Sequence, residues 1–196
     1  MQWRRCTQDA LRRIAQNSGF YSQPEGLPAL RTAIAGHIAF SRGVKCRDSD
    51  IVVTNGAQQA LDLIARVVLE PGSIVAMEDP GYSPARQLFV AMGASVASVP
   101  VDEQGIQVDK IPDGTRLIYV TPSHQFPLGL PMSVPRRDAL LARASELGAI
   151  IIEDDYDSEF RYEGRQLNQQ GDIDRHLAQR RHVKPGHGGH RFEPRR

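Results

Sequence analysis

Hydrophobic residues recur along the chain in two patterns: short continuous runs and longer segments with a spacing of three or four. The short runs predict strands at residues 51–54, 73–77, 95–99, 117–121 and 150–152. The longer segments predict helices that include residues 9–16, 27–42, 61–68, 85–92 and 136–147. Because strands and helices alternate, we expect an α/β fold with three α/β/α layers and a mostly parallel sheet.

The last predicted strand leads directly into a dense run of acids. Five acids occur within seven positions: Glu153, Asp154, Asp155, Asp157 and Glu159. Ligands of open α/β sheets bind outside the carboxyl ends of the strands. A carboxylate there is partly desolvated and needs a cationic or hydrogen-bonding partner, such as a protonated ring nitrogen. The alternative is a solvated loop after a core strand.

Two strand-to-helix turns are further candidates for ligand contacts. Gly56 and Ala57 precede a helix whose first N–H groups are free, so a phosphate can approach them. Tyr82 lies in a loop stiffened by two prolines, where its ring can stack on a flat ligand. Ordinary turn geometry and packing of Tyr82 on its neighbours are the alternatives.

A third polar loop, residues 122–129, follows the predicted strand at 117–121. It contains His124, Gln125 and two prolines. Loops beyond buried strands are where ligand contacts concentrate, although a single histidine also serves as a hydrogen-bonded structural residue.

Composition narrows the class of protein. The 196 residues are 40% hydrophobic and 24% charged, which suits one sizeable domain, and the net charge of +1 argues against a surface dedicated to polyanions. Cys6 and Cys46 match no metal or redox spacing and indicate free thiols. No apolar run approaches the roughly 20 residues that span a bilayer. We expect a cytoplasmic protein without membrane contact.

Taken together, six stretches resemble one known family. The chain resembles the large domain of fold type I pyridoxal 5'-phosphate (PLP) enzymes, the class I/II aminotransferases, and more specifically the aminotransferase-like domain of MocR-type regulators in the GntR family. The matching stretches are residues 21–31, 42–44, 54–61, 78–82, 121–129 and 153–162. The resemblance implies a partial, incomplete PLP-binding large domain at residues 1–167. Residues 168–196, with seven Lys or Arg against three acids, are expected to form a basic tail with little structure.

The resemblance implies cofactor-binding roles for six residues: Gly56, Ala57, Gln58, Tyr82, Asp154 and Tyr156. The first three match the segment that holds the cofactor phosphate. Tyr82 matches the aromatic residue that stacks on the ring, and Tyr156 the phenol near the ring hydroxyl. Asp154 matches the carboxylate that keeps the pyridine nitrogen protonated, which makes the ring an electron sink.

The chain also departs from the family pattern. Phe126 stands where the wider aminotransferases have an Asn that hydrogen-bonds the ring hydroxyl. The only lysines are Lys45, Lys110 and Lys184, and none lies in the Phe-Ser-Lys motif of the Schiff-base lysine. We therefore expect weak, non-covalent PLP binding, no catalytic residue and no transaminase activity.

The family further implies a homodimer and an amino-acid-like or vitamer ligand. In the family a winged-helix domain precedes the segment that begins at Trp3, so we expect no DNA binding by this chain. Two alternatives are a remnant without stable cofactor binding and a piece that acts only by dimerising with an intact relative. A carboxylate-pair hydrolase on Asp154, Asp155 and Asp157 is a third. No metal is expected, because the four tail histidines match no ligand spacing.

Overall fold

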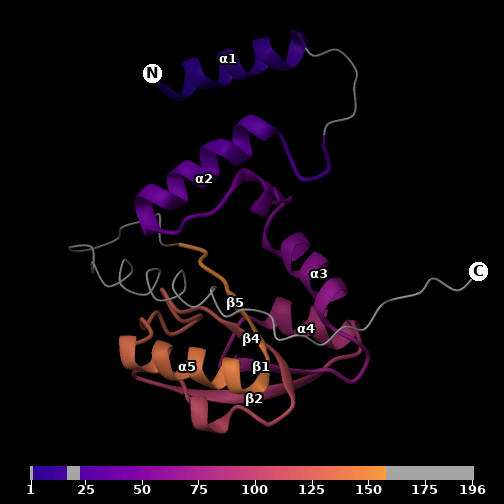
Figure 1. The fold of residues 1–196 in the computed structure, drawn as a ribbon, viewed down its shortest axis with the longest axis vertical. Helices are drawn as coiled ribbons and strands as arrows, with labels where there is room; N and C mark the ends of the chain where they lie inside the picture. Colours follow the sequence, from indigo (N-terminus) through magenta and orange to yellow (C-terminus); the bar gives the residue numbers. More distant parts are fainter. Residues whose placement is uncertain (1, 17–22, 158–196) are drawn as a thin grey trace, which may run out of the picture. The chain divides into compact units, whose positions relative to one another are not determined.

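The structure, a computed structural model, describes residues 2–16 and 23–157. The described residues divide into two compact units: unit 1 holds residues 2–16, 23–41 and 45–53, and unit 2 holds residues 42–44 and 54–157. The tail predicted at residues 168–196, with Lys184 and its histidines, lies outside the described residues (Figure 1).

Unit 1 is built mainly from two helices, α1 (Gln2–Gln16) and α2 (Pro28–Arg42), and a 3₁₀ turn, η1 (Asp48–Asp50). The helix predicted at 27–42 is confirmed. The helix predicted at residues 9–16 begins earlier than expected, because α1 extends back to Gln2.

The strand predicted at residues 51–54 was also wrong. These residues form no strand in the described chain. Instead, the N–H of Val53 donates a 2.9 Å hydrogen bond to the carbonyl of Glu25. Gly26 has a φ of +104° and lies so close to Val53 that an added Cβ would stand 2.7 Å from the Val53 side chain. β-Branched residues favour extended backbone, but a strand also needs a hydrogen-bonded neighbour, and this segment pairs with no described strand.

Unit 2 contains a five-stranded sheet in the order β3-β2-β1-β4-β5. The strands are β1 (Ile74–Asp79), β2 (Ser95–Asp102), β3 (Gly105–Ile106), β4 (Thr115–Val120) and β5 (Ile150–Glu153). β1 pairs in parallel with both β2 and β4, and β4 pairs in parallel with β5. The mostly parallel sheet predicted from the sequence is therefore confirmed.

The short strand β3 adds an antiparallel edge to the sheet. β2 continues to Asp102, and β3 returns antiparallel beside it. The carboxylate of Asp102 accepts a 2.8 Å hydrogen bond from the N–H of Gln104, which closes the turn between β2 and β3.

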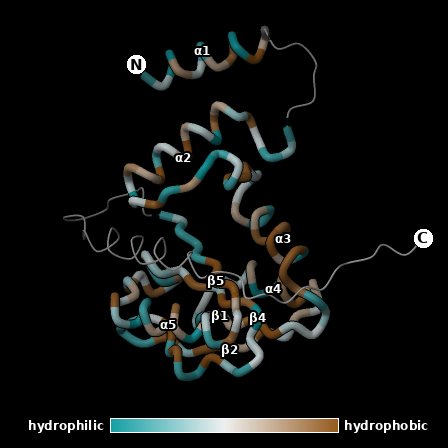
Figure 2. Tube along the Cα trace, in the orientation of Figure 1, coloured by the Kyte–Doolittle hydropathy of each residue, from teal (hydrophilic) through white to brown (hydrophobic). Residues whose placement is uncertain are grey.

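Helices cover both faces of this sheet. α3 (Ala57–Val68) and α4 (Ser83–Ala91) pack on one face, where Val75, Met77 and Phe89 belong to one buried cluster. α5 (Val134–Leu147) packs on the other face, where Ala76 and Leu140 belong to a second cluster. Successive strand residues point to opposite faces, so β1 serves both clusters. Figure 1 shows α5 and the α3–α4 pair around the strands, and Figure 2 shows the hydrophobic character of α3.

α5 begins two residues before the predicted Arg136 and ends at the predicted Leu147. Ser133 caps the first turn by accepting a hydrogen bond from the N–H of Arg136. Gly148 ends the helix with a φ of +63°, a conformation that glycine adopts readily. The chain then turns directly into β5 beside β4. No helix in the described part of the chain is long and apolar enough to cross a bilayer.

Candidate ligand site at the carboxyl ends of the strands

The sheet order places three candidate ligand-binding loops at one edge of unit 2. β4 lies between β1 and β5, and all three run parallel. Tyr82 follows β1, Phe126 follows β4, and Asp154 and Tyr156 follow β5. Because the carboxyl ends of parallel strands meet at the same edge, these side chains share one end of the sheet, as the sequence predicted.

Asp154 is held by its own backbone and by a buried phenol. Its N–H donates a 2.9 Å hydrogen bond to the carbonyl of Val120, and its Oδ2 accepts a 2.6 Å hydrogen bond from the hydroxyl of Tyr119. Burial, followed by the hydrogen bond to Asp154, raises the pKa of Tyr119, so the phenol stays protonated and acts as the donor. Among the described residues no cation forms an ion pair with Asp154, which leaves its charge available to a cationic ligand.

Three aromatic side chains, Tyr82, Phe126 and Tyr156, form an aromatic trio at this edge. The ring of Phe126 lies 5.7 Å from Tyr82 and 6.2 Å from Tyr156, with interplanar angles of 87° and 84°. Such edge-to-face contacts fix the rings relative to one another. Burial raises the pKa of Tyr156, and the charges of Asp157 and Asp154 add to this shift. Phe126 and Tyr156 keep 38% and 49% of their surface exposed, so the trio presents apolar surface to a flat ligand.

The start of α3 offers N–H groups to an anion. Gly56 is the N-cap residue, with a φ of +91°, and no side chain caps the helix. The first-turn N–H groups at Ala57 and Gln58 therefore resemble a helix-terminal phosphate site. The side-chain amide of Gln58 donates a 3.4 Å hydrogen bond to the carbonyl of Pro84, which links the starts of α3 and α4.

The acids after β5 have separate partners. Asp155 forms an ion pair with Arg42, whereas Oδ1 of Asp157 lies 2.7 Å from Nδ1 of His124. Asp154 binds Tyr119. The three carboxylates thus engage three different groups and do not converge as an acid–base pair would, which argues against the hydrolase alternative.

Sequence reasoning missed two residues of this site, Tyr119 and Glu78. Tyr119 lies in a mostly apolar strand. The role of its hydroxyl becomes visible only from its hydrogen bond to Asp154, 35 positions later. Glu78 ends an apolar run in β1 and is 1% exposed. An acid inside a buried strand was the available signal, because such residues are rarely buried without a specific partner.

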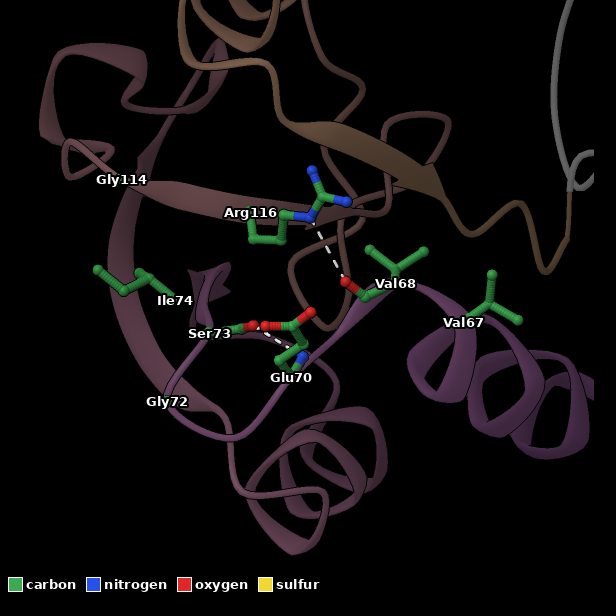
Figure 3. Close-up of a pocket in the computed structure, with 8 residues that line it drawn as sticks. All are labelled: Val67, Val68, Glu70, Gly72, Ser73, Ile74, Gly114 and Arg116. Carbon is green, nitrogen blue, oxygen red and sulfur yellow. Dashed lines mark hydrogen bonds between the residues drawn. The ribbon is translucent and has the colours of Figure 1, made fainter. Parts of the chain in front are cut away.

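A separate hollow of about 450 Å³ lies at the opposite end of the sheet (Figure 3). The end of α3 and the amino ends of β1 and β4 line it. Its polar groups bond one another or the backbone: Nε of Arg116 reaches the carbonyl of Val68, and the N–H of Glu70 reaches the hydroxyl of Ser73. It contains none of the predicted site residues, and ligands of parallel sheets bind at the other end.

Comparisons with known proteins agree with this architecture. The chain is 42% identical over 146 residues to the probable rhizopine catabolism regulatory protein MocR of Rhizobium meliloti, covering 74% of this chain and 30% of MocR. It is 40% identical to the pyridoxine biosynthesis regulator PdxR of Corynebacterium glutamicum, covering 75% of this chain and 32% of PdxR. The chain thus spans about a third of the length of these relatives.

A solved structure extends the likeness to the fold. The α-aminoadipate aminotransferase LysN of Thermus thermophilus, complexed with N-(5'-phosphopyridoxyl)-L-leucine, matches with a TM-score of 0.72 and 32% identity, over 87% of this chain and 44% of LysN. The described fold is therefore a partial large domain of the fold type I PLP-dependent enzymes. The chain belongs to the aminotransferase class I and II family, whose pattern matches residues 2–178. The family predicted from the sequence motifs is confirmed.

Proposed function

We propose that this chain provides the PLP-binding face of an aminotransferase-like domain and binds the cofactor weakly and without a covalent bond. The observation that carries the proposal is the carboxylate of Asp154, fixed by Tyr119 at the carboxyl edge of the sheet. Its fixed negative charge beside the aromatic trio suits a flat cationic ring.

Each part of the site fits one part of the cofactor. The first turn of α3, at Gly56, Ala57 and Gln58, suits the phosphate, because its N–H groups lack a side-chain cap. Tyr82 suits a ring face and Tyr156 the ring hydroxyl. PLP supplies a protonated pyridine ring that withdraws electrons from a bound substrate. In this chain Asp154 would hold the proton on the ring nitrogen, and Tyr119 would orient Asp154.

The placement of the lysines supports non-covalent binding. Lys110 ends the 3₁₀ turn η2 (Val108–Lys110), which comes before β4 and therefore leads to the amino end of that strand. Its ammonium lies 3.5 Å from Asp109. Lys45 comes before the first strand of the sheet and so follows none of the strands whose carboxyl ends form the site. No lysine in the described part of the chain thus follows a strand of the site, and without a lysine there as amine and base we expect no transamination.

The likeness to MocR and PdxR suggests the biological setting. We infer a role within bacterial transcription regulation, with an amino-acid-like or vitamer small molecule as the ligand and a homodimer as the assembly. A different candidate, a non-enzymatic piece that acts by dimerising with an intact relative, is favoured by one observation. In the described chain no strand covers the outer edge of β5, so a second chain can pair there.

Titration of the full chain with PLP tests the proposal. We expect saturable binding that dialysis reverses, and no stoichiometric pyridoxyl adduct on any lysine after borohydride reduction and mass spectrometry. Replacing Gly56 by Ala should weaken binding, because φ of +91° disfavours a Cβ there although the space beside it is open. Gly72→Ala, with a φ of +87° and open space at the opposite end of the sheet, is the control. Absence of saturable binding by the wild-type chain would contradict the proposal, and a stoichiometric adduct would contradict its non-covalent part.

A further inference from the structure

A buried polar network joins the two loops that carry Tyr82 and Phe126. The Tyr82 loop comprises residues 80–82, and the Phe126 loop comprises residues 121–131. Glu78 lies two residues before the first loop, and its Oε2 accepts hydrogen bonds from the N–H and the hydroxyl of Thr121 at 3.1 and 2.7 Å. The end of β1 is thus tied to the start of the Phe126 loop.

The amide of Gln125 makes the second connection. This residue is 2% exposed, and its Nε2 donates 2.7 Å hydrogen bonds to the carbonyls of Pro80 and Phe126. The same nitrogen lies 3.4 Å from Oε2 of Glu78. Its Oε1 accepts from the N–H of Leu128 at 3.2 Å. One side chain therefore binds the backbones of both loops.

Thr121 completes the network through its hydroxyl, which donates to Glu78 and accepts a 2.9 Å hydrogen bond from the N–H of Phe126. The Tyr82 loop is equally constrained, because a Cβ on Gly81 would stand 2.3 Å from the carbonyl oxygen of Glu78. The backbones of Phe126 and of the residues before Tyr82 are therefore both fixed by direct contacts with Glu78, Thr121 or Gln125.

Burying this polar network costs more free energy than apolar packing at the same positions would. Glu78 is a buried acid without an ion-pair partner among the described residues, and its Oε1 has no hydrogen-bond partner there. Apolar residues of similar volume would fill such a position at lower cost. A buried polar network instead specifies one geometry, because each donor and acceptor must be matched.

We propose that Glu78, Thr121 and Gln125 are positioning residues. They hold the rings of Tyr82 and Phe126 in a fixed geometry relative to one another and thereby set the affinity of the site for the PLP ring. The part that concerns PLP rests on the proposed function, whereas the geometry of the two rings is independent of it. The three residues act through the aromatic side chains and are not catalytic residues.

The test uses the full chain and two readouts. The nuclear Overhauser effect between the rings of Tyr82 and Phe126 reports their geometry without cofactor, and titration with PLP reports affinity. Thr121→Val, which removes the hydroxyl and keeps the volume, should abolish the ring contact and weaken PLP binding at least fivefold. Thr121→Ser should restore both. Amide protons of β1 and β2 should keep their protection against hydrogen exchange.

Gln125→Met supplies a second variant if Thr121→Val does not fold, and Glu103→Gln, an exposed acid in a turn, is the control. Retention of the ring contact and of PLP affinity in Thr121→Val and Gln125→Met would overturn the proposal. Loss of exchange protection throughout β1 and β2, or failure of Thr121→Ser to restore the contact, would also overturn it by showing a purely structural role. If the wild-type chain binds no PLP, the proposed function fails, and the ring contact alone decides this inference.

Discussion

The hydroxyl of Tyr119 and the carboxylate of Asp154 meet at 2.6 Å because two adjacent parallel strands end together. Tyr119 is paired in register with Ile152, and the chain places Asp154 two residues beyond that pair. Tyr119 is 1% exposed, so its phenol has no access to water as an alternative partner. Asp154, the candidate partner of the ring nitrogen, thus accepts a hydrogen bond from the neutral, buried phenol of Tyr119.

Replacing Tyr119 by Phe tests the value of this donor. The ring volume and the contact with Phe89, 6.1 Å between ring centroids, are kept, so the fold should persist. Asp154 loses its hydrogen bond, and PLP affinity should fall by about 1 kcal/mol, or about fivefold in the dissociation constant. Fluorescence titration of both proteins measures this. Unchanged affinity would mean that Asp154 is oriented by its backbone alone.

The acids after β5 should differ in their contribution to cofactor binding. Asp154→Ala should weaken PLP binding by roughly 1.5–3 kcal/mol, the value of a charge-assisted hydrogen bond. Asp157→Ala removes only the partner of His124 and should change the affinity little. Isothermal titration calorimetry at matched ionic strength compares the two variants. Equal losses would indicate that the acidic run acts as a diffuse field.

The sequence predicted the individual helices and strands better than it predicted which segments pair in the sheet. Periodicity located α2, α5 and β4 because each has a continuous apolar pattern that depends on local residues alone. Residues 51–54 show the same kind of pattern, yet whether they become a strand depends on a neighbour that periodicity does not encode.

The same limit applies to the site. Asp154 and Tyr82 were visible as unusual residues after apolar runs, and the sheet order brings their strand ends together. The hydrogen bonds of Glu78 to Thr121, 43 positions away, depend on the register of β1 against β4. No local pattern indicates that register, so the partner of the buried acid was not predictable.

The buried carboxyl of Glu78 should make stability depend on pH. Burial raises the pKa of Glu78 above its ordinary value of 4.5, although hydrogen bonds from Thr121 and Gln125 oppose the shift. Since the pKa of Glu78 is higher in the folded than in the unfolded state, protonation of Glu78 stabilises the fold, and this contribution is complete below about pH 4.5. It is lost as the pH rises through the folded-state pKa.

Glu78→Gln removes this titration and keeps a polar side chain of the same size. The free energy of unfolding of the variant minus that of the wild type should increase from pH 4.5 upward and become constant above the folded-state pKa. A constant offset from altered hydrogen bonds does not affect this slope. Urea titrations at a series of pH values measure the difference, with Glu103→Gln as the exposed control. Parallel curves for wild type and Glu78→Gln would contradict a raised pKa.

The outer edge of β5 should control association of the chain. β5 is the last strand of the described sheet, and Ile150 at its start is 41% exposed. Exposed apolar edge strands pair with other chains, and a lysine on such an edge opposes that pairing by its charge. Ile150→Lys should therefore raise the soluble monomeric fraction in size-exclusion chromatography, with little change in the urea midpoint.

Ile152→Lys is the matched comparison on the same strand. Ile152 is partly buried against the cluster that contains Val75, Met77 and Phe89, so a lysine there should lower the free energy of unfolding by roughly 2–4 kcal/mol through lost apolar packing and partial burial of its charge. If Ile150→Lys leaves the fraction of aggregated chain unchanged while Ile152→Lys unfolds the protein, association must use a surface other than the edge of β5. If Ile150→Lys itself unfolds the chain, its side chain must contribute to packing more than its exposure indicates.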